Sequence, residues 1–328
     1  MSAMSASAPR GRATVEVAAE DALAPGANGG TPRKRDPLPI GLVKLARPKQ
    51  WAKNVLVFAA PAAAGVLDNR EWAVDAAVAF VAFCLAASGT YYVNDARDVA
   101  ADRLHPTKRN RPVASGSVPV PVAYAGGAVL LAAALATGLA VNGNLALTVA
   151  GYAVLTTAYS SVLKHVAVVD LVAVAAGFVL RAVGGAAATD IPLSDWFFIV
   201  TSFGALFMIS GKRAAEAREM GDGATDFRTV LAAYSPTYTA YLRSVSSGAV
   251  LVAYCLWAFE KAEASPFSPT IPWYQLSILP FVMAVLRYAL VLDQGRGSAP
   301  EEIVLGDRPL QLIGVAWVIV FTIGVYTA

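Results

Sequence analysis

Nine apolar runs, most of them close to 20 residues long, constrain the fold of this chain more than any other feature of its sequence. A helix needs about 20 apolar residues to cross the hydrocarbon core of a bilayer. Hydrophobic residues make up 56% of the chain and charged residues only 15%, against about 25% charged in an average soluble domain. The sequence therefore predicts an all-α polytopic membrane helix bundle of about nine transmembrane helices. The predicted spans cover residues 54–67, 73–93, 118–140, 144–163, 166–188, 194–210, 237–259, 272–292 and 309–327.

Prolines interrupt two of these runs. The first run is short and contains Pro61, and we expect it to begin as early as Leu42 as a tilted or interfacial helix. Pro280 lies inside the eighth run and predicts a kink, which membrane helices tolerate.

Residues 1–36 differ from the rest of the chain. They are rich in Ala, Gly, Pro and Ser, with scattered charges and no periodic apolar face. Such a segment cannot bury enough surface to become ordered, and it lacks the apolar stretch of a secretory signal peptide. We therefore predict a disordered cytoplasmic tail at 1–36, followed by a transmembrane catalytic domain at 37–328.

Lys and Arg are distributed unequally between the two sides of the predicted bundle. With nine spans, the N-terminal segment and the alternate loops that share its side hold 21 of the 26 Lys and Arg residues. The opposite side holds only Arg70 and Lys261. Because positively charged loops stay in the cytoplasm, we predict a multi-pass protein of the plasma (cell) membrane with a cytoplasmic N-terminus. Because a miscounted helix would remove this asymmetry, the unequal distribution of Lys and Arg also supports the number of spans.

Several common kinds of site are excluded. Cys84 and Cys255 both lie in apolar runs, which supports neither a disulfide framework nor a cysteine zinc site. The sequence has two histidines and no P-loop, C-x-x-C or H-E-x-x-H motif. We expect no nucleic acid among the partners.

An acidic cluster follows the second apolar run. Asp95, Asp98 and Asp102 recur at i, i+3 and i+7, and Asn94 joins the last two at steps of four. A helix that continues beyond the membrane would present all four on one face. Carboxylates this close repel one another unless cations lie between them, and hard oxygen ligands suit Mg²⁺, which shares its shell with substrate phosphates. The pattern predicts a magnesium site formed by Asn94 and three catalytic aspartates.

Basic residues follow directly in segment 103–112. Arg103, Lys108 and Arg111 are donors suited to phosphate. A metal would neutralise the charge on a departing diphosphate, and the bases would hold that group in place. The alternative is a solvated loop that obeys the positive-inside rule. That alternative explains the arginines but not three aspartates on one face at a membrane edge.

The segment Asn94-Asp95-x-x-Asp98-x-x-x-Asp102 resembles the first aspartate motif of the UbiA superfamily of intramembrane prenyltransferases. Nine helices, with aspartate-bearing cytoplasmic loops after helices two and six, are also typical of that superfamily. Segments 47–54, 102–112 and 159–165 resemble its phosphoribosyltransferase branch, which serves actinobacterial cell-wall (arabinan and arabinogalactan) synthesis. Over residues 40–328, the resemblance implies Mg²⁺ as cofactor, and phosphoribosyl pyrophosphate and a polyprenyl (decaprenyl) phosphate as substrates.

The second loop departs from the superfamily pattern. Ordinary prenyltransferases carry a second D-x-x-x-D there, whereas this chain has Lys212 and Arg213 in place of one acid and Glu216 where another would be. These residues favour a substrate with more anionic groups, because phosphoribosyl pyrophosphate carries a 5-phosphate besides its diphosphate, and a lipid phosphate must also bind. For Lys212 and Arg213 individually, a basic loop under the positive-inside rule is the alternative.

Two charged residues lie inside the fifth run. Asp170 and Arg181 share a helical face but are roughly 16 Å apart, too far to pair, so each needs another partner. Because a charge at this depth costs at least ~3 kcal/mol, we expect Arg181 to face a polar cavity and hold phosphate, with Lys164 and Asp170 near its cytoplasmic mouth. Snorkelling or a structural ion pair is the alternative. The resemblance adds three candidate site residues, namely Lys53, Asn54 and Tyr159.

The reaction implied by the resemblance moves 5-phosphoribose from phosphoribosyl pyrophosphate to a polyprenyl phosphate and releases diphosphate, which makes the chain a pentosyltransferase. The first alternative is an ordinary prenyltransferase that moves an isoprenoid from its diphosphate to an aromatic or other small acceptor. A transporter is the second alternative, but it predicts inverted repeats around a midplane site, and no clear internal repeat is present. A homo-oligomer is left open.

Overall fold

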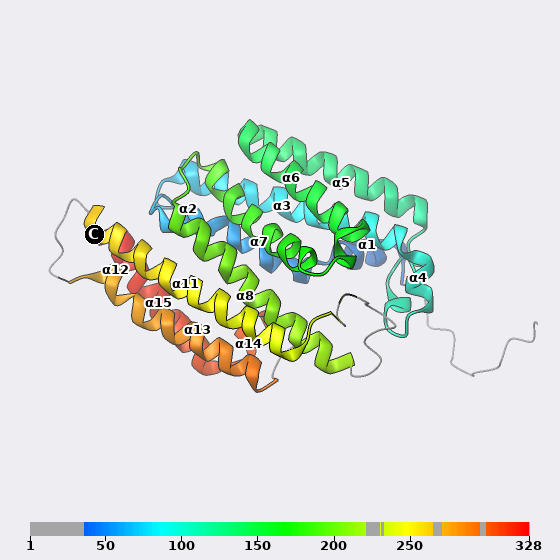
Figure 1. Cartoon of the computed structure of the whole chain (residues 1–328). Coiled ribbons are helices and arrows are strands. Elements are labelled where there is room, and N and C mark those ends of the chain that lie inside the picture. The colour runs from blue at the N-terminus through cyan, green and yellow to red at the C-terminus, as the bar shows by residue number, and fades with distance from the viewer. Residues whose placement is uncertain (1–35, 221–229, 231–232, 265–270, 296–299, 328) are drawn as a thin grey trace, which may run out of the picture. The chain divides into compact units, whose positions relative to one another are not determined.

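In the computed structural model, residues 36–220, 230, 233–264, 271–295 and 300–327 are described, and every regular element among them is a helix (Figure 1). This confirms the predicted all-α class. The predicted tail lies outside the described residues except for Asp36, and Arg228 and Arg296 of the predicted cytoplasmic loops lie outside them too. The elements are α1 (Leu38–Ala46), η1 (Pro48–Phe58), α2 (Ala59–Ala63), α3 (Arg70–Arg97), α4 (Val99–Leu104), η2 (Lys108–Asn110), α5 (Val120–Val141), α6 (Gly143–Ser161), η3 (Leu163–His165), α7 (Val169–Ala188), α8 (Asp195–Met220), α11 (Pro236–Ala264), α12 (Trp273–Leu276), α13 (Ile278–Asp293), α14 (Pro300–Gly306) and α15 (Arg308–Thr327).

Seven helical segments in the described part of the chain are long and apolar enough to cross a membrane, and each coincides with a predicted span. They are α3, α5, α7, α8, α11, the α12–α13 pair and α15. The 19-residue α6 accounts for the predicted span 144–163. Within the eighth span the helix breaks at Ser277, three residues before Pro280, because the proline ring clashes with the carbonyl group four residues earlier.

The first predicted span is a broken helix. α1 ends at Ala46, because Pro48 disfavours the α conformation of Arg47, the residue before it. Arg47 itself adopts a left-handed φ of 52°. The chain continues as the 3-10 helix η1, in which Asn54 is fully buried, and then as the short α2. Gly185 of α7 lies directly against η1, and a methyl group at Gly185 would lie 1.7 Å from the carbonyl oxygen of Val57. A glycine is therefore required where this broken segment meets α7.

Small residues allow the other helices to approach closely, as is typical of membrane bundles. α3 packs along α5 where Gly89 and Gly127 meet, and a Cβ on either would lie 3.1 Å from the carbonyl oxygen of the other. α7 contacts both α6 and α8, and α11 runs beside α8 (Figure 1). This packing brings the C-terminal ends of α3, α6 and α8 and the N-terminal end of α7 to the same end of the bundle, where the candidate site lies.

Candidate active site

The acidic loop is divided between two helices. Asp95 lies in the last turn of α3, Asp98 is the residue between α3 and α4, and Asp102 lies in α4. Asp98 has φ −85° and ψ 6°, so the single continuous helix expected from the spacing is interrupted there. Asp95 and Asp102 are 1% and 3% exposed, whereas the Asp98 side chain is 25% exposed. The three carboxylates therefore do not share one face.

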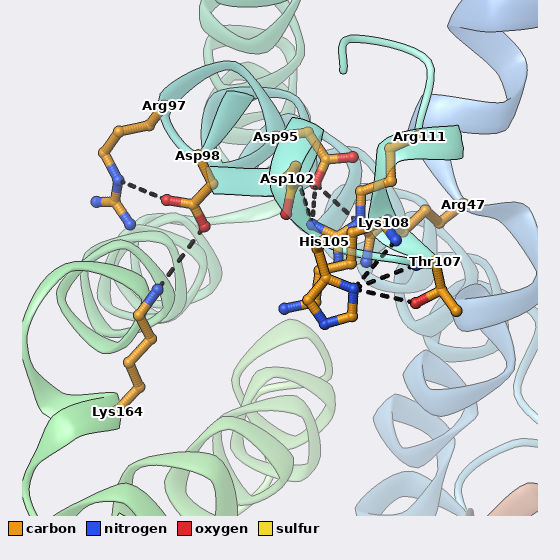
Figure 2. Close-up of polar contacts among 10 residues, drawn as sticks. All are labelled: Arg47, Asp95, Arg97, Asp98, Asp102, His105, Thr107, Lys108, Arg111 and Lys164. Atoms are coloured by element: carbon orange, nitrogen blue, oxygen red, sulfur yellow. Dashed lines mark hydrogen bonds and ion pairs between the residues drawn. The ribbon is translucent and has the colours of Figure 1, made fainter. Parts of the chain in front are cut away.

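Arg111 joins the two buried carboxylates (Figure 2). Its Nη1 atom lies 3.2 Å from Oδ1 of Asp95 and 2.8 Å from Oδ2 of Asp102. Arg47 approaches Asp95 from the helix break, with Nη2 2.7 Å from the same Oδ1, and its guanidinium lies 4.5 Å from the centre of the Tyr91 ring. Two guanidinium groups thus neutralise a pair of carboxylates that would otherwise repel each other.

Asp98 turns toward the other side of the site. Its Oδ1 lies 3.5 Å from Nε of Arg97, and its Oδ2 lies 3.7 Å from Nζ of Lys164 (Figure 2). Arg97 also donates to the carbonyl oxygen of Ser160 at 2.6 Å and to the hydroxyl of Ser161. These contacts fix the end of α3 against the end of α6, and they explain why Asp98 leaves the face of its two neighbours.

Arg103 and Lys108 also lie in this loop. Nε of Arg103 donates to the carbonyl oxygen of Ala114 at 3.2 Å, and the exposed Lys108 lies in η2. Nδ1 of His105 accepts the backbone N–H groups of Thr107 at 3.3 Å and Lys108 at 3.4 Å. Desolvation and the neighbouring Lys108 lower the pKa of His105 below its usual 6.5. The neutral imidazole therefore folds the loop back on itself rather than adding positive charge.

Two carboxylates of the acidic loop lie close enough together to share a magnesium ion. Among the described residues, no three His, Cys, Asp or Glu side chains meet as a metal-holding group. Asp95 and Asp102 nevertheless converge on one nitrogen of Arg111, so both lie within reach of a single cation. Mg²⁺ commonly takes one or two carboxylates and completes its shell with water and substrate phosphates. The donor chemistry of this pair suits that ion.

Arg213 is the centre of a second buried cluster. Its Nε donates to Oδ2 of Asp170 at 3.0 Å, Nη1 to Oε2 of Glu216 at 2.6 Å and Nη2 to the hydroxyl of Tyr159 at 3.0 Å. The Arg213 side chain is 4% exposed and that of Asp170 is 0% exposed. Lys212 is 39% exposed, with Nζ 3.8 Å from Glu216. Of the two basic residues, Lys212 is thus the one open to an anionic ligand, while each guanidinium nitrogen of Arg213 bonds within the protein.

Arg181 lies deeper in the bundle and is 7% exposed. Its Nε donates to the Asn54 side chain at 2.7 Å, Nη1 to the carbonyl oxygen of Gly177 at 2.6 Å and Nη2 to the hydroxyl of Tyr152 at 2.8 Å. Nδ2 of Asn54 in turn donates to Sγ of Cys84 at 3.1 Å. The predicted separation of Arg181 from Asp170 is confirmed, because each has found other partners. Arg181 fastens the broken first segment to α7 and α6.

Two further predicted residues lie on η1 and α3. Nζ of Lys53, on η1, donates to the side chain of Gln50 at 2.6 Å. Asn94 precedes Asp95 on α3, and its carbonyl oxygen accepts the backbone N–H of Asp98 at 2.9 Å.

Sequence reasoning gave no site role to three residues that the structure places in these networks. Arg47 was only part of a resemblance motif, Tyr152 lies in an apolar run and reads as core, and Tyr234 follows a charged loop. Tyr234 donates to the buried carboxylate of Asp170, and burial together with this hydrogen bond raises the pKa of Tyr234. A hydroxyl or guanidinium group that forms a hydrogen bond with a buried residue far away in the sequence produces no motif or periodic pattern by which the sequence could reveal it.

Comparisons with known proteins agree with this arrangement. Residues 55–305 match the sequence profile of the UbiA prenyltransferase family. A Corynebacterium glutamicum protein named decaprenyl-phosphate phosphoribosyltransferase is 45% identical over 301 residues, which cover 90% of this chain and 90% of that protein. A Mycobacterium tuberculosis protein of the same name is 45% identical over 86% of this chain and 93% of its own length.

Solved structures agree in fold. A UbiA homolog from Archaeoglobus fulgidus, bound to GPP and Mg²⁺, superposes with a TM-score of 0.66 at 19% identity. The match covers 88% of this chain and 100% of that one. At this identity the likeness shows the fold alone.

Proposed function

This chain belongs to the UbiA prenyltransferase family, and we propose that within it the chain moves the 5-phosphoribosyl group of phosphoribosyl pyrophosphate to decaprenyl phosphate or a similar polyprenyl phosphate. The observation that carries this proposal is the 45% identity, over nine tenths of both chains, to a relative named for that transfer. The second loop supports it, because Lys212 and Arg213 stand where ordinary prenyltransferases carry acid. The activity is that of a pentosyltransferase for cell-wall precursors.

The transfer exchanges one C–O bond for another. The bond from ribose C1 to the diphosphate breaks, and C1 acquires oxocarbenium character as the diphosphate leaves with the bonding electron pair. An oxygen of the lipid phosphate then forms the new bond to C1. Because this phosphate is already anionic near neutral pH, its attack needs no general base. The protein's task is to hold two highly charged substrates together and to stabilise the leaving diphosphate.

Asp95 and Asp102 would hold Mg²⁺, which supplies positive charge to the leaving diphosphate. In the structure, Arg111 and Arg47 neutralise these carboxylates. Both guanidinium groups are about a quarter exposed at the side chain, so they retain donors for the oxygens of a bound diphosphate. Lys164, beside Asp98, lies on the opposite side of the loop and adds a cation for the 5-phosphate of the donor.

Lys212 and the Arg213 cluster act at the neighbouring helix end. Lys212 is open to solvent and would bind an anionic group of either substrate. Arg213 holds Asp170, Glu216 and Tyr159 in fixed positions behind it. Arg181 carries a positive charge inside the bundle. Among the described residues, its three hydrogen-bond acceptors are neutral groups, so no carboxylate neutralises this charge. Such a charge favours the binding of an anionic group nearby.

The chain is a multi-pass membrane protein, and we place it in the plasma membrane with its N-terminus and active site in the cytoplasm. The excess of Lys and Arg on that side supports this orientation. The soluble donor then arrives from the cytoplasm, while the polyprenyl tail lies along the apolar faces of the helices.

The test uses the purified full chain in detergent with Mg²⁺, decaprenyl phosphate and ribose-labelled phosphoribosyl pyrophosphate. We expect label in the organic phase, in a product with the mass of decaprenyl phosphate plus phosphoribose. In parallel, geranyl diphosphate and an aromatic acid are supplied as substrates. Prenylation of the acid without phosphoribosyl transfer would overturn the proposal in favour of an ordinary prenyltransferase.

A further inference from the structure

Tyr234 connects the Arg213 cluster to the turn before α7, although no motif includes it. It precedes α11 and is 5% exposed. Its hydroxyl donates to Oδ1 of Asp170 and accepts the backbone N–H of Val168 at 2.7 Å. One hydroxyl group therefore contacts both the first turn of α7 and Val168, the residue that precedes that helix.

Val168 needs such a partner because its backbone is strained. It has φ 68° and ψ −46°, a conformation that is an outlier for a β-branched residue. Strained residues of this kind persist only where the surrounding structure holds them, and they cluster at functional sites. The Tyr234 hydroxyl is held in its turn by Asp170, which Arg213 fixes at 3.0 Å.

The strained residue lies four positions after Lys164. The segment between Lys164 and Val168 is short and is held by backbone hydrogen bonds. The N–H of Val166 donates to the carbonyl oxygen of Leu163 at 3.1 Å, and the N–H of Asp170 donates to the carbonyl oxygen of Val166 at 3.0 Å. We therefore expect a change at Val168 to displace η3, which carries Lys164. Nζ of Lys164 lies 3.7 Å from Asp98 on the acidic loop (Figure 2).

We propose that Tyr234 is a positioning residue for the phosphoribosyl donor: by holding the turn at Val168, it keeps the ammonium group of Lys164 beside Asp98, where a donor phosphate binds. The proposal rests on the proposed function, in which Lys164 faces the donor. Tyr234 touches neither substrate and acts only through the turn.

The first experiment compares Tyr234→Phe with Tyr238→Phe. The Tyr238 ring stacks on that of Tyr234 at 5.8 Å, so both variants remove one hydroxyl from the same aromatic pair. We expect Tyr234→Phe to raise the KM for phosphoribosyl pyrophosphate about tenfold, equivalent to about 1.4 kcal/mol, with kcat within about twofold of wild type. Tyr238→Phe should leave both constants unchanged. A fall in kcat with unchanged KM in Tyr234→Phe would overturn the proposal.

The second experiment asks whether Tyr234 acts through Lys164. The KM for the donor is measured in Lys164→Ala and in the double variant Tyr234→Phe/Lys164→Ala. If Tyr234 only positions Lys164, the double variant has the same KM as Lys164→Ala alone. Effects that multiply would overturn the proposal, because they would mean that Tyr234 acts by another route.

A third measurement does not depend on activity. Hydrogen exchange of residues 162–170, followed by mass spectrometry on the full chain in detergent, reports the turn directly. We expect Tyr234→Phe to speed exchange in this segment and Tyr238→Phe to leave it unchanged. Unchanged exchange in Tyr234→Phe overturns the proposal. If wild-type protein transferred no phosphoribose, the proposed function would fail, and this measurement would still decide whether Tyr234 holds the turn.

Discussion

Replacing Arg213 by methionine should destabilise the protein far more than the same change at its neighbour Lys212. Arg213 and Asp170 are 4% and 0% exposed at their side chains, so Arg213→Met leaves a buried carboxylate without its guanidinium partner. Removing one member of a buried ion pair costs about 3–5 kcal/mol. Lys212 is 39% exposed and lies 3.8 Å from Glu216, and an exposed pair contributes about 0–1 kcal/mol.

The assay is the apparent Tm of each variant in one detergent at one scan rate, since membrane proteins often unfold irreversibly. At about 2–4 °C per kcal/mol, we expect Arg213→Met to lower the Tm by on the order of 10 °C and Lys212→Met by much less. Adding Asp170→Asn to Arg213→Met should restore part of the loss, because no charge is then left buried. If Arg213→Met and Lys212→Met have the same Tm, and Arg213→Met instead weakens binding of the donor, then Arg213 is a phosphate ligand and our account of the cluster is refuted.

Three other predictions concern separate features. Gly185→Ala should abolish folding or lower the Tm sharply, because its methyl group would lie 1.7 Å from a carbonyl oxygen of η1, whereas Gly151→Ala, which meets nothing within 4 Å, should leave the Tm nearly unchanged. Asp102→Asn should raise the Mg²⁺ concentration needed for half-maximal transfer, and an unchanged Mg²⁺ requirement would exclude Asp102 as a ligand. NMR of the two histidines should show a pKa below 6.5 for His105 in the folded protein. Because the unfolded chain binds a proton on His105 more tightly than the folded protein does, the stability that neutral His105 contributes is lost as the pH falls.

The fold was largely predictable because the bilayer imposes one length on every span. Helices α3, α5, α7 and α15 coincide with apolar runs that hydropathy alone locates. The break after α1 was harder to predict, because it depends on Arg47 adopting a left-handed conformation before Pro48 and on Gly185 accepting η1 at close range. Hydropathy carries no information about such contacts between distant segments.

The site was predictable as chemistry and less so as geometry. The spacing of Asp95, Asp98 and Asp102 predicted a cluster of carboxylates, and in the structure all three lie where α3 meets α4. Their division into a buried pair and an outward Asp98 follows from long-range partners, Arg111 on one side and Lys164 on the other. These pairings depend on the tertiary fold, so spacing within one helix could not reveal them.

The central claim of the proposal is that Asp95 and Asp102 would hold the Mg²⁺ ion that binds the leaving diphosphate while phosphoribose is transferred to a lipid phosphate. The most direct test measures released diphosphate and lipid-linked phosphoribose together in wild type, Asp95→Asn, Asp102→Asn and Asp75→Asn. Asp75 lies on the same helix as Asp95 but about 30 Å away at its other end. At one subsaturating Mg²⁺ concentration, we predict equal amounts of both products in wild type and Asp75→Asn, and much smaller amounts of both products in the other two variants. Undiminished, equimolar products in Asp95→Asn and Asp102→Asn would contradict the account.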